Sequence, residues 1–144
     1  MTGPEPDSPY PALIPGARPV LVVMSDLLFR SRVDEVARRV GLPLRVAKSL
    51  EQLDRHLEHQ AVALAIVDLE AERLDAAEAI RRIKASAGGG ETPVLAFAGH
   101  TNLAAIEAGR AAGATVVLAR SAFTAQLPTV LSRVAEAARA QPEG

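Results

Sequence analysis

Short apolar runs alternate with helical patterns along most of this chain, and this alternation limits the folds that it can adopt. Each run is nearly continuous, which is typical of a strand buried on both faces of a parallel sheet. After each run, apolar residues recur three or four positions apart among charged ones, which is typical of an amphipathic helix. The runs occupy residues 20–24, 44–47, 62–67, 94–98 and 115–119.

The succession of five strand–helix units predicts a parallel sheet with right-handed crossovers. The strands are too few, and their connections too short, for a closed eightfold barrel. We therefore expect the α/β class: a flavodoxin-like, doubly wound (βα)5 parallel sheet with the strand order 2-1-3-4-5. Hydrophobic residues make up 49% of the chain and aromatic residues only 3%, which favours a core of Val, Leu, Ile and Ala.

The domain boundaries follow from a change in composition near residue 19. A length of 144 residues suits one domain, which we expect to span residues 19–140. Residues 1–18 hold five prolines and indicate a disordered, Pro-rich tail, although such a segment can also bind a partner groove as a polyproline II helix. The chain ends soon after the last helical pattern, so we expect a stand-alone module without an output domain.

Several classes of protein are disfavoured by composition. The chain has no Cys, which excludes disulfides and thiol chemistry. Its formal net charge is -1, which gives no indication of nucleic-acid binding. Neither a secretory signal nor an apolar run long enough to span a bilayer is visible, so we expect no membrane partner and a cytoplasmic location. The glycines at 88–90 lack a following Lys-Ser or Lys-Thr and are interpreted as a connector.

Capping signals predict where some helices begin and end. Ser49 and Gln52 have capping-box spacing before a leucine stripe, and Gly113 stands at a helix-stop position. Thr124 is the expected N-cap of the last helix, which places Pro128 in the first turn, where a missing N–H costs nothing.

Acidic side chains follow two strands that the predicted topology makes neighbours. Asp26 follows the first strand, and Asp68 follows the third, with Glu70 two residues further on. The carboxyl ends of parallel strands meet at one edge of a sheet, so these groups should converge there. Two carboxylates facing one cleft can bind Mg2+ through oxygen, and a carboxylate beside that ion can attack phosphorus.

These motifs, in this order, resemble the receiver domain of bacterial response regulators over residues 19–139. The best match is AIVDLEAERLDAAEAIRRIK, residues 65–84, which is similar to a receiver's third strand, its phosphoacceptor Asp and the next helix. PVLAFAG at 93–99 is similar to the fourth strand. AGATVVLARSAFT at 112–124 resembles the stretch that reads Ala-Gly-Ala, strand, Lys-Pro-Phe in a receiver.

The resemblance implies specific roles for a few residues. Asp68 stands where a receiver has its phosphoacceptor, and Arg120 stands where it has a Lys. Asp26, Asp68 and the backbone carbonyl of Glu70 are the implied metal ligands.

The chain also departs from the receiver pattern at its active-site positions. Ser25 replaces one of the two acids after the first strand, and Ala98 replaces the hydroxyl residue that ends the fourth. Arg120 replaces the Lys, Ser121 replaces the proline after it, and one residue is inserted before Phe123.

Each departure has a physical consequence. The missing acid weakens Mg2+ binding, and the missing hydroxyl removes a hydrogen bond to a phosphoryl group. The planar guanidinium of Arg120 is not equivalent to an ammonium, and we expect it to contact Asp68 or Asp26 and to take the place of a metal ion. We therefore expect a pseudo-receiver that works without phosphorylation and binds Mg2+ weakly.

The function expected from the sequence is that of a two-component signalling module that is not an enzyme. Its partner would be a histidine kinase or a downstream protein, and a homodimer could form through the face made by the fourth helix, fifth strand and fifth helix. That face is rich in small residues: Ala104, Ala105, Ala108, Ala111 and Ala112.

Other interpretations stay open at this stage. The chain could be a working phosphoacceptor with an unusual site, with His100 supplying a hydrogen bond that the missing hydroxyl would have made. Asp26 and Asp68 could instead be a helix cap and a loop cap. A flavin- or nucleotide-binding protein of the same fold, or a metal-dependent hydrolase, are alternatives of other classes.

Overall fold

The computed structural model describes residues 8–141 and consists of strands and helices in strict alternation. The elements are β1 (Val20–Val23), α1 (Leu27–Arg39), β2 (Leu44–Ala47), α2 (Leu50–His59), β3 (Leu64–Asp68), α3 (Ala76–Ala85), β4 (Val94–Ala98), α4 (Leu103–Ala112), β5 (Val116–Ala119) and α5 (Arg120–Ala140).

The strands form one five-stranded sheet in the order β2-β1-β3-β4-β5, and every pair is parallel. Val22 in β1 pairs with Val46 of β2 and with Ile66 of β3, which makes β1 and β3 neighbours. The predicted fold class and strand order are therefore confirmed.

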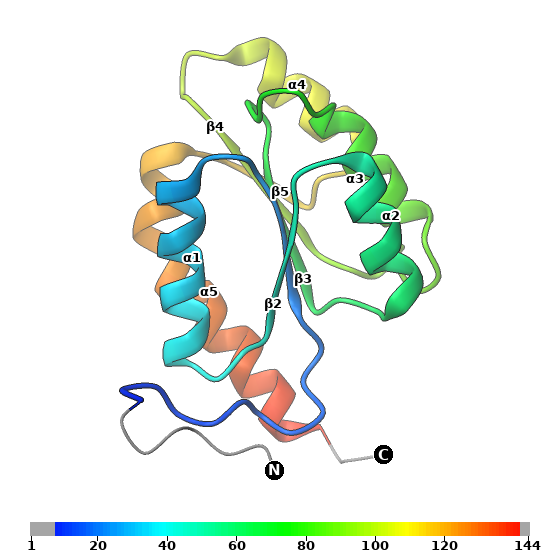
Figure 1. Cartoon of the computed structure of the whole chain (residues 1–144). Helices are drawn as coiled ribbons and strands as arrows, with labels where there is room; N and C mark the ends of the chain where they lie inside the picture. The colour runs from blue at the N-terminus through cyan, green and yellow to red at the C-terminus, as the bar shows by residue number, and fades with distance from the viewer. Residues whose placement is uncertain (1–7, 142–144) are drawn as a thin grey trace.

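Alternate residues of each strand enter two separate cores on opposite faces of the sheet. Val20 and Val22 pack with apolar residues of α1 and α5, whereas Leu21 and Val23 pack with those of α2 and α3. Figure 1 shows α1 and α5 covering one face of the sheet and α2, α3 and α4 covering the other. Because both faces are covered, β1, β3 and β4 are apolar except at Asp68, the last residue of β3, as the sequence pattern indicates.

Two of the predicted helix ends are present. The Ser49 hydroxyl accepts a hydrogen bond from the Gln52 amide at 3.1 Å, and α4 ends at Gly113, whose φ is 113°. A left-handed φ of this kind strains any residue with a Cβ, so glycine suits the stop.

The predicted start of the last helix is wrong. Helix α5 begins at Arg120, directly after β5, and Thr124 lies inside it with its hydroxyl donating to the Arg120 carbonyl at 3.0 Å. Ala119 precedes the helix and makes no side-chain cap. Thr124 has the chemistry of an N-cap, but a threonine within a helix can equally bond to the carbonyl one turn back. The helix therefore starts one turn earlier than the capping signal suggests.

The segment before the sheet lies at the edge opposite the strands' carboxyl ends (Figure 1). Residues 1–7 of the predicted tail lie outside the described residues. Further along, the Ile14 amide donates to the Gly41 carbonyl at 2.9 Å, and its side chain packs against the core shared by α1 and α5. Within residues 8–141, no helix combines the length and apolar character needed to cross a bilayer.

Candidate functional site

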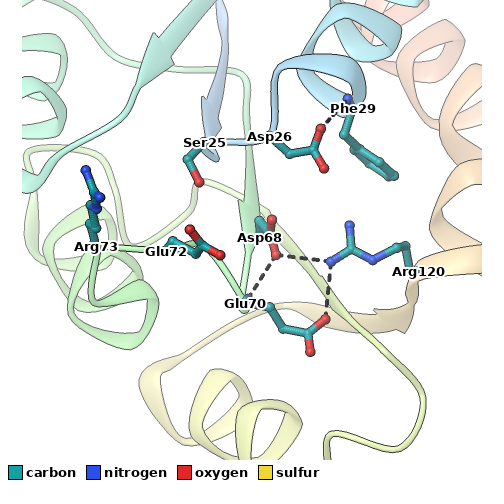
Figure 2. A pocket seen from close by; sticks show the side chains of 8 residues that line it. All are labelled: Ser25, Asp26, Phe29, Asp68, Glu70, Glu72, Arg73 and Arg120. Carbon is teal, nitrogen blue, oxygen red and sulfur yellow. Dashed lines mark hydrogen bonds and ion pairs between the residues drawn. The ribbon is translucent and has the colours of Figure 1, made fainter.

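A cavity of about 610 Å3 opens at the carboxyl edge of the sheet, where β1, β3 and β5 end. Figure 2 shows side chains from the segments after these three strands pointing into it. The lining residues are Ser25, Asp26, Phe29, Asp68, Glu70, Glu72, Arg73 and Arg120. The topology thus brings together Ser25, Asp26, Asp68, Glu70 and Arg120, which the sequence places at three separate strand ends.

Asp68 is the buried acid of this cavity. It is the last residue of β3 and only 5% exposed, and its Oδ1 accepts a hydrogen bond from the Glu70 amide at 2.9 Å. Burial raises the pKa of Asp68 above its ordinary value, although the Glu70 amide and the Arg120 charge both act to lower it. The carboxylate is therefore held at a strand end at an energetic cost, as is common at functional sites.

Arg120 points into the cavity from the first turn of α5, and the predicted contact with Asp68 is present. Its Nη2 lies 3.6 Å from Asp68 Oδ1 and 3.2 Å from Glu70 Oε1. The guanidinium carbon also lies 5.3 Å and 5.0 Å from the ring centroids of Phe29 and Phe97. A planar cation can stack on aromatic faces while it pairs with carboxylates, which an ammonium does less well.

Those rings belong to a stack of three phenylalanines below the cavity. The centroid of Phe97 lies 4.9 Å from that of Phe29 and 4.4 Å from that of Phe123. The three residues come from β4, α1 and α5, so the stack ties both helices to the sheet under the site. It also gives Arg120 a fixed platform.

Asp26 lines the same cavity, but one of its carboxylate oxygens already accepts a hydrogen bond from helix α1. It is the N-cap of α1, and its Oδ1 accepts a hydrogen bond from the Phe29 amide at 3.0 Å. Its charge also acts to raise the pKa of Asp68, which is consistent with two acids facing one space. The helix-cap interpretation of Asp26 is therefore correct, and it is compatible with a place in the site.

Glu70 is the residue whose part in the site the sequence did not reveal. The resemblance implies a role only for its backbone carbonyl, as a metal ligand, whereas the structure shows its side chain reaching the loop after β4. Hydrogen bonds from the Asn102 amide group and the Gly99 N–H, together with Arg120, hold the pKa of Glu70 below its ordinary value. Gly99 and Asn102 are 29 and 32 positions from Glu70 in the sequence, and no spacing rule links residues so far apart. The one signal for these contacts is that β3 and β4 are neighbours in the sheet, which brings the segments after them together.

The donor set is compatible with weak Mg2+ binding but does not form a complete metal centre. Asp26 and Asp68 offer carboxylate oxygens to one cavity, which is the chemistry that Mg2+ requires. Within the part of the chain that the structure describes, however, no three His, Cys, Asp or Glu side chains are grouped to hold a metal ion. The cation beside Asp68 is instead Arg120.

The remaining candidate positions take little part in the cavity. Ala98 ends β4 and is fully buried, whereas His100 and Ser121 are exposed and do not line the cavity. His100 therefore has no place in the arrangement that the structure shows.

Solved structures that this chain resembles include receiver domains. The receiver domain of the sensor histidine kinase PA1611 from Pseudomonas aeruginosa, which has a magnesium ion coordinated in its active-site cleft, matches with a TM-score of 0.71 and 22% identity, over 84% of this chain and 99% of that one. The chemotaxis response regulator CheY4 of Vibrio cholerae matches with a TM-score of 0.69 and 20% identity, over 82% and 98% of the two chains. The receiver domain of NtrX from Brucella abortus matches at 0.67 and 24%, over 81% and 98%.

No family model matches the sequence, and no curated protein matches it either. The chain therefore has the flavodoxin-like fold of response-regulator receiver domains, with five parallel strands in the order 2-1-3-4-5 and five helices. At these identities the likeness defines the fold, and the function of the site has to be argued from its own residues.

Replacing Asp68 with Asn should stabilise the protein at neutral pH. A carboxyl whose pKa is raised on folding destabilises the folded state when it is ionised. This penalty shrinks as the pH falls through the raised pKa and is gone below the ordinary pKa of the carboxyl. Asn removes the charge and keeps an oxygen for the Glu70 amide, so the free energy of unfolding should rise by about 1 kcal/mol at pH 7. Urea unfolding measures the change.

Asp26→Asn is the matched control, because Asn caps a helix as well as Asp does. Its free energy of unfolding should stay within about 0.5 kcal/mol of the parent value. The gain from Asp68→Asn should shrink in acid, where Asp68 is protonated in both states. Loss of stability in Asp68→Asn at pH 7 would show that the ion pair with Arg120 outweighs burial.

Proposed function

We propose that this chain is a receiver-like signalling module of the two-component type that works by protein–protein interaction rather than by turnover. In this proposal Asp68 occupies the phosphoacceptor position, and the protein holds its active conformation without phosphorylation. We also propose a cytoplasmic location, as expected for a partner of a histidine kinase or of a downstream signalling protein.

The ion pair between Arg120 and the two acids carries this proposal. Arg120 lies 3.6 Å from Asp68 and 3.2 Å from Glu70, so a cation of the chain itself pairs with both acids. A phosphoryl group arriving at Asp68 would have to displace this guanidinium or share it with Glu70. The pairing supports a site in which a cation of the chain already stands beside Asp68.

The proposed interaction surface is the face formed by α4, β5 and α5. Leu103 in α4 is 69% exposed, and Val116 in β5 is 46% exposed. Ala104, Ala108 and Ala111 are also exposed on α4. Exposed apolar residues flanked by small ones allow close approach by another helix, either from a signalling partner or from a second copy of this chain.

A working phosphoacceptor with an unusual site is the second candidate. It is supported by Asp26 and Asp68 lining one cavity, and by a solved receiver of the same fold that has magnesium in its cleft. The flavin alternative is not favoured, since Phe29 is the one aromatic residue among the cavity's lining residues, and it is stacked in the core. A metal-dependent hydrolase would need more protein ligands for its metal ion than Asp26 and Asp68 provide.

Intact mass spectrometry after incubation with Mg2+ and acetyl phosphate in the cold tests the proposal. Most of the protein should stay unmodified, because phosphoryl transfer needs a well-held metal, a mobile cation and a hydroxyl donor around the phosphoryl oxygens. A receiver domain with the usual acids, hydroxyl residue and Lys serves as the positive control. A stoichiometric gain of one phosphoryl group that Asp68→Ala abolishes would instead establish a working phosphoacceptor.

A further inference from the structure

The side chain of Glu70 crosses the carboxyl edge of the sheet and joins segments that are far apart in the sequence. It leaves the loop after β3 and meets Gly99 and Asn102 after β4 and Arg120 at the start of α5. In Figure 2 it turns toward Arg120 while its backbone amide stays bonded to Asp68. One carboxylate therefore connects three strand ends.

Both oxygens of this carboxylate are engaged. Glu70 Oε1 accepts from the Gly99 N–H at 2.7 Å and from Arg120 Nη2 at 3.2 Å, and Oε2 accepts from Asn102 Nδ2 at 2.8 Å. Charge-assisted hydrogen bonds to a carboxylate are stronger than neutral ones, so the three together hold the side chain in one conformation.

Asn102 passes this constraint on to helix α4. Its Oδ1 caps the helix by accepting from the Ala105 amide at 3.1 Å, while its amide group donates to Glu70. Its backbone N–H donates to the Gly99 carbonyl at 3.0 Å. Glu70 therefore binds both the loop after β4, through Gly99, and the N-cap residue of α4, Asn102.

Leu69, the residue before Glu70, makes a second contact between this segment and α4. A Cβ built on Gly109 would lie 2.9 Å from the methyl carbons of Leu69, so α4 rests directly on that side chain. Leu69 also donates its backbone N–H to the Phe97 carbonyl at 2.9 Å. The segment after β3 therefore contacts α4 at two places. Leu69 packs against Gly109, and Glu70 binds Asn102 at the start of the helix.

We propose that Glu70 is a positioning residue that latches the loop after β4, the first turn of α4 and the Arg120 side chain into one arrangement. We call this set the Glu70 latch: Glu70, Gly99, Asn102 and Arg120. Release of Glu70 frees the first turn of α4 and lets Arg120 move away from Asp68, which changes the exposed surface around Leu103. The latch is a property of the folded chain, and it does not depend on whether Asp68 is phosphorylated.

The charge on Glu70 supports this assignment. An ionised carboxylate has no proton to donate, so it can accept from Gly99, Asn102 and Arg120 at once. Its side chain is still 31% exposed, so water can replace the bonds when the latch opens without a large loss of overall stability.

Amide hydrogen exchange on the full chain, in the parent and in Glu70→Ala, tests the latch. Peptides covering residues 99–105 should exchange at least about tenfold faster in the variant, because the loop and the helix cap lose their acceptor. Peptides from α2, on the far side of α3, should be unchanged. Glu70→Gln should be intermediate, since its amide oxygen can still accept from Gly99 while its NH2 group faces other donors.

Glu72→Ala is the matched control, because Glu72 is exposed and lines the same cavity but makes no hydrogen bond or ion pair among the described residues. Its exchange should equal that of the parent chain. Three outcomes would overturn the proposal: exchange at 99–105 within about twofold of the parent in Glu70→Ala, equal effects of the two alanine variants, or an acceleration spread evenly over the protein. Acetyl phosphate is absent from this experiment, so its result is separate from that of the phosphorylation test.

Discussion

Replacing Phe97 with Ala should lower the free energy of unfolding by about 3 to 5 kcal/mol, the largest stability change that we expect from a single substitution near the site. Phe97 is fully buried in β4, and its ring packs against both Phe29 and Phe123, which also contact each other. Its loss removes the one ring of this cluster that belongs to the sheet and leaves a cavity between the sheet and the two helices α1 and α5. Urea unfolding followed by circular dichroism measures the change.

The same substitution should also loosen the ion pair in the cavity. The Arg120 guanidinium lies 5.0 Å from the Phe97 ring, so the ring restricts the directions that Arg120 can take. Phe97→Leu, which refills most of the volume, should cost about 1 to 2 kcal/mol and still remove the aromatic platform. Leu28→Ala is the matched control, since Leu28 is 84% exposed and should change stability by less than about 0.5 kcal/mol. A decrease of less than about 1 kcal/mol in the free energy of unfolding of Phe97→Ala would show that the three rings do not stabilise the core as a cluster.

Restoring the three receiver-type residues should convert the chain into an efficient phosphoacceptor. The variant carries Ser25→Asp, Ala98→Thr and Arg120→Lys together. The new acid lies beside Asp26 in the cavity, the hydroxyl stands at the end of β4, and the smaller cation no longer spans Asp68 and the Phe97 ring. Each restored interaction with the phosphoryl group should contribute substantially, and the rate of labelling at Asp68 should rise by about 10² to 10³.

Time-resolved intact mass spectrometry with Mg2+ and acetyl phosphate gives this rate. Adding Asp68→Ala to the triple variant should abolish the label, and omitting Mg2+ should suppress it. Ala98 is fully buried, so circular dichroism has to confirm that the added methyl and hydroxyl groups leave the fold intact. A folded triple variant that is labelled no faster than the parent chain would show that these three departures do not silence the site.

The fold could be predicted from the sequence because its signals are local and repeat. Runs such as 20–24 and 94–98 are apolar at every position, since both faces of their strands are covered, and the apolar stripes between them have helical spacing. Right-handed crossovers then leave few arrangements for five such units. The same reasoning placed Asp26, Asp68 and Arg120 at one edge, because the ends of parallel strands converge there.

The boundaries of the elements were less well predicted, as the last helix shows. Thr124 has the side chain of an N-cap, but the helix begins at Arg120 because β5 turns directly into it. The start of α5 depends on where Phe123 and Leu127 meet the core, and a capping residue alone does not specify that position.

The sequence alone determined the class of fold, the strand order and the convergence of Asp26, Asp68 and Arg120 at one edge of the sheet. The contacts among those groups required the tertiary structure. Glu70 bonds to Gly99 and Asn102 from 29 and 32 residues away, and the phenylalanine stack under Arg120 joins β4 to α1 and α5. Periodicity and capping act over a few residues, whereas these contacts depend on how far each loop extends beyond its strand once the sheet has formed.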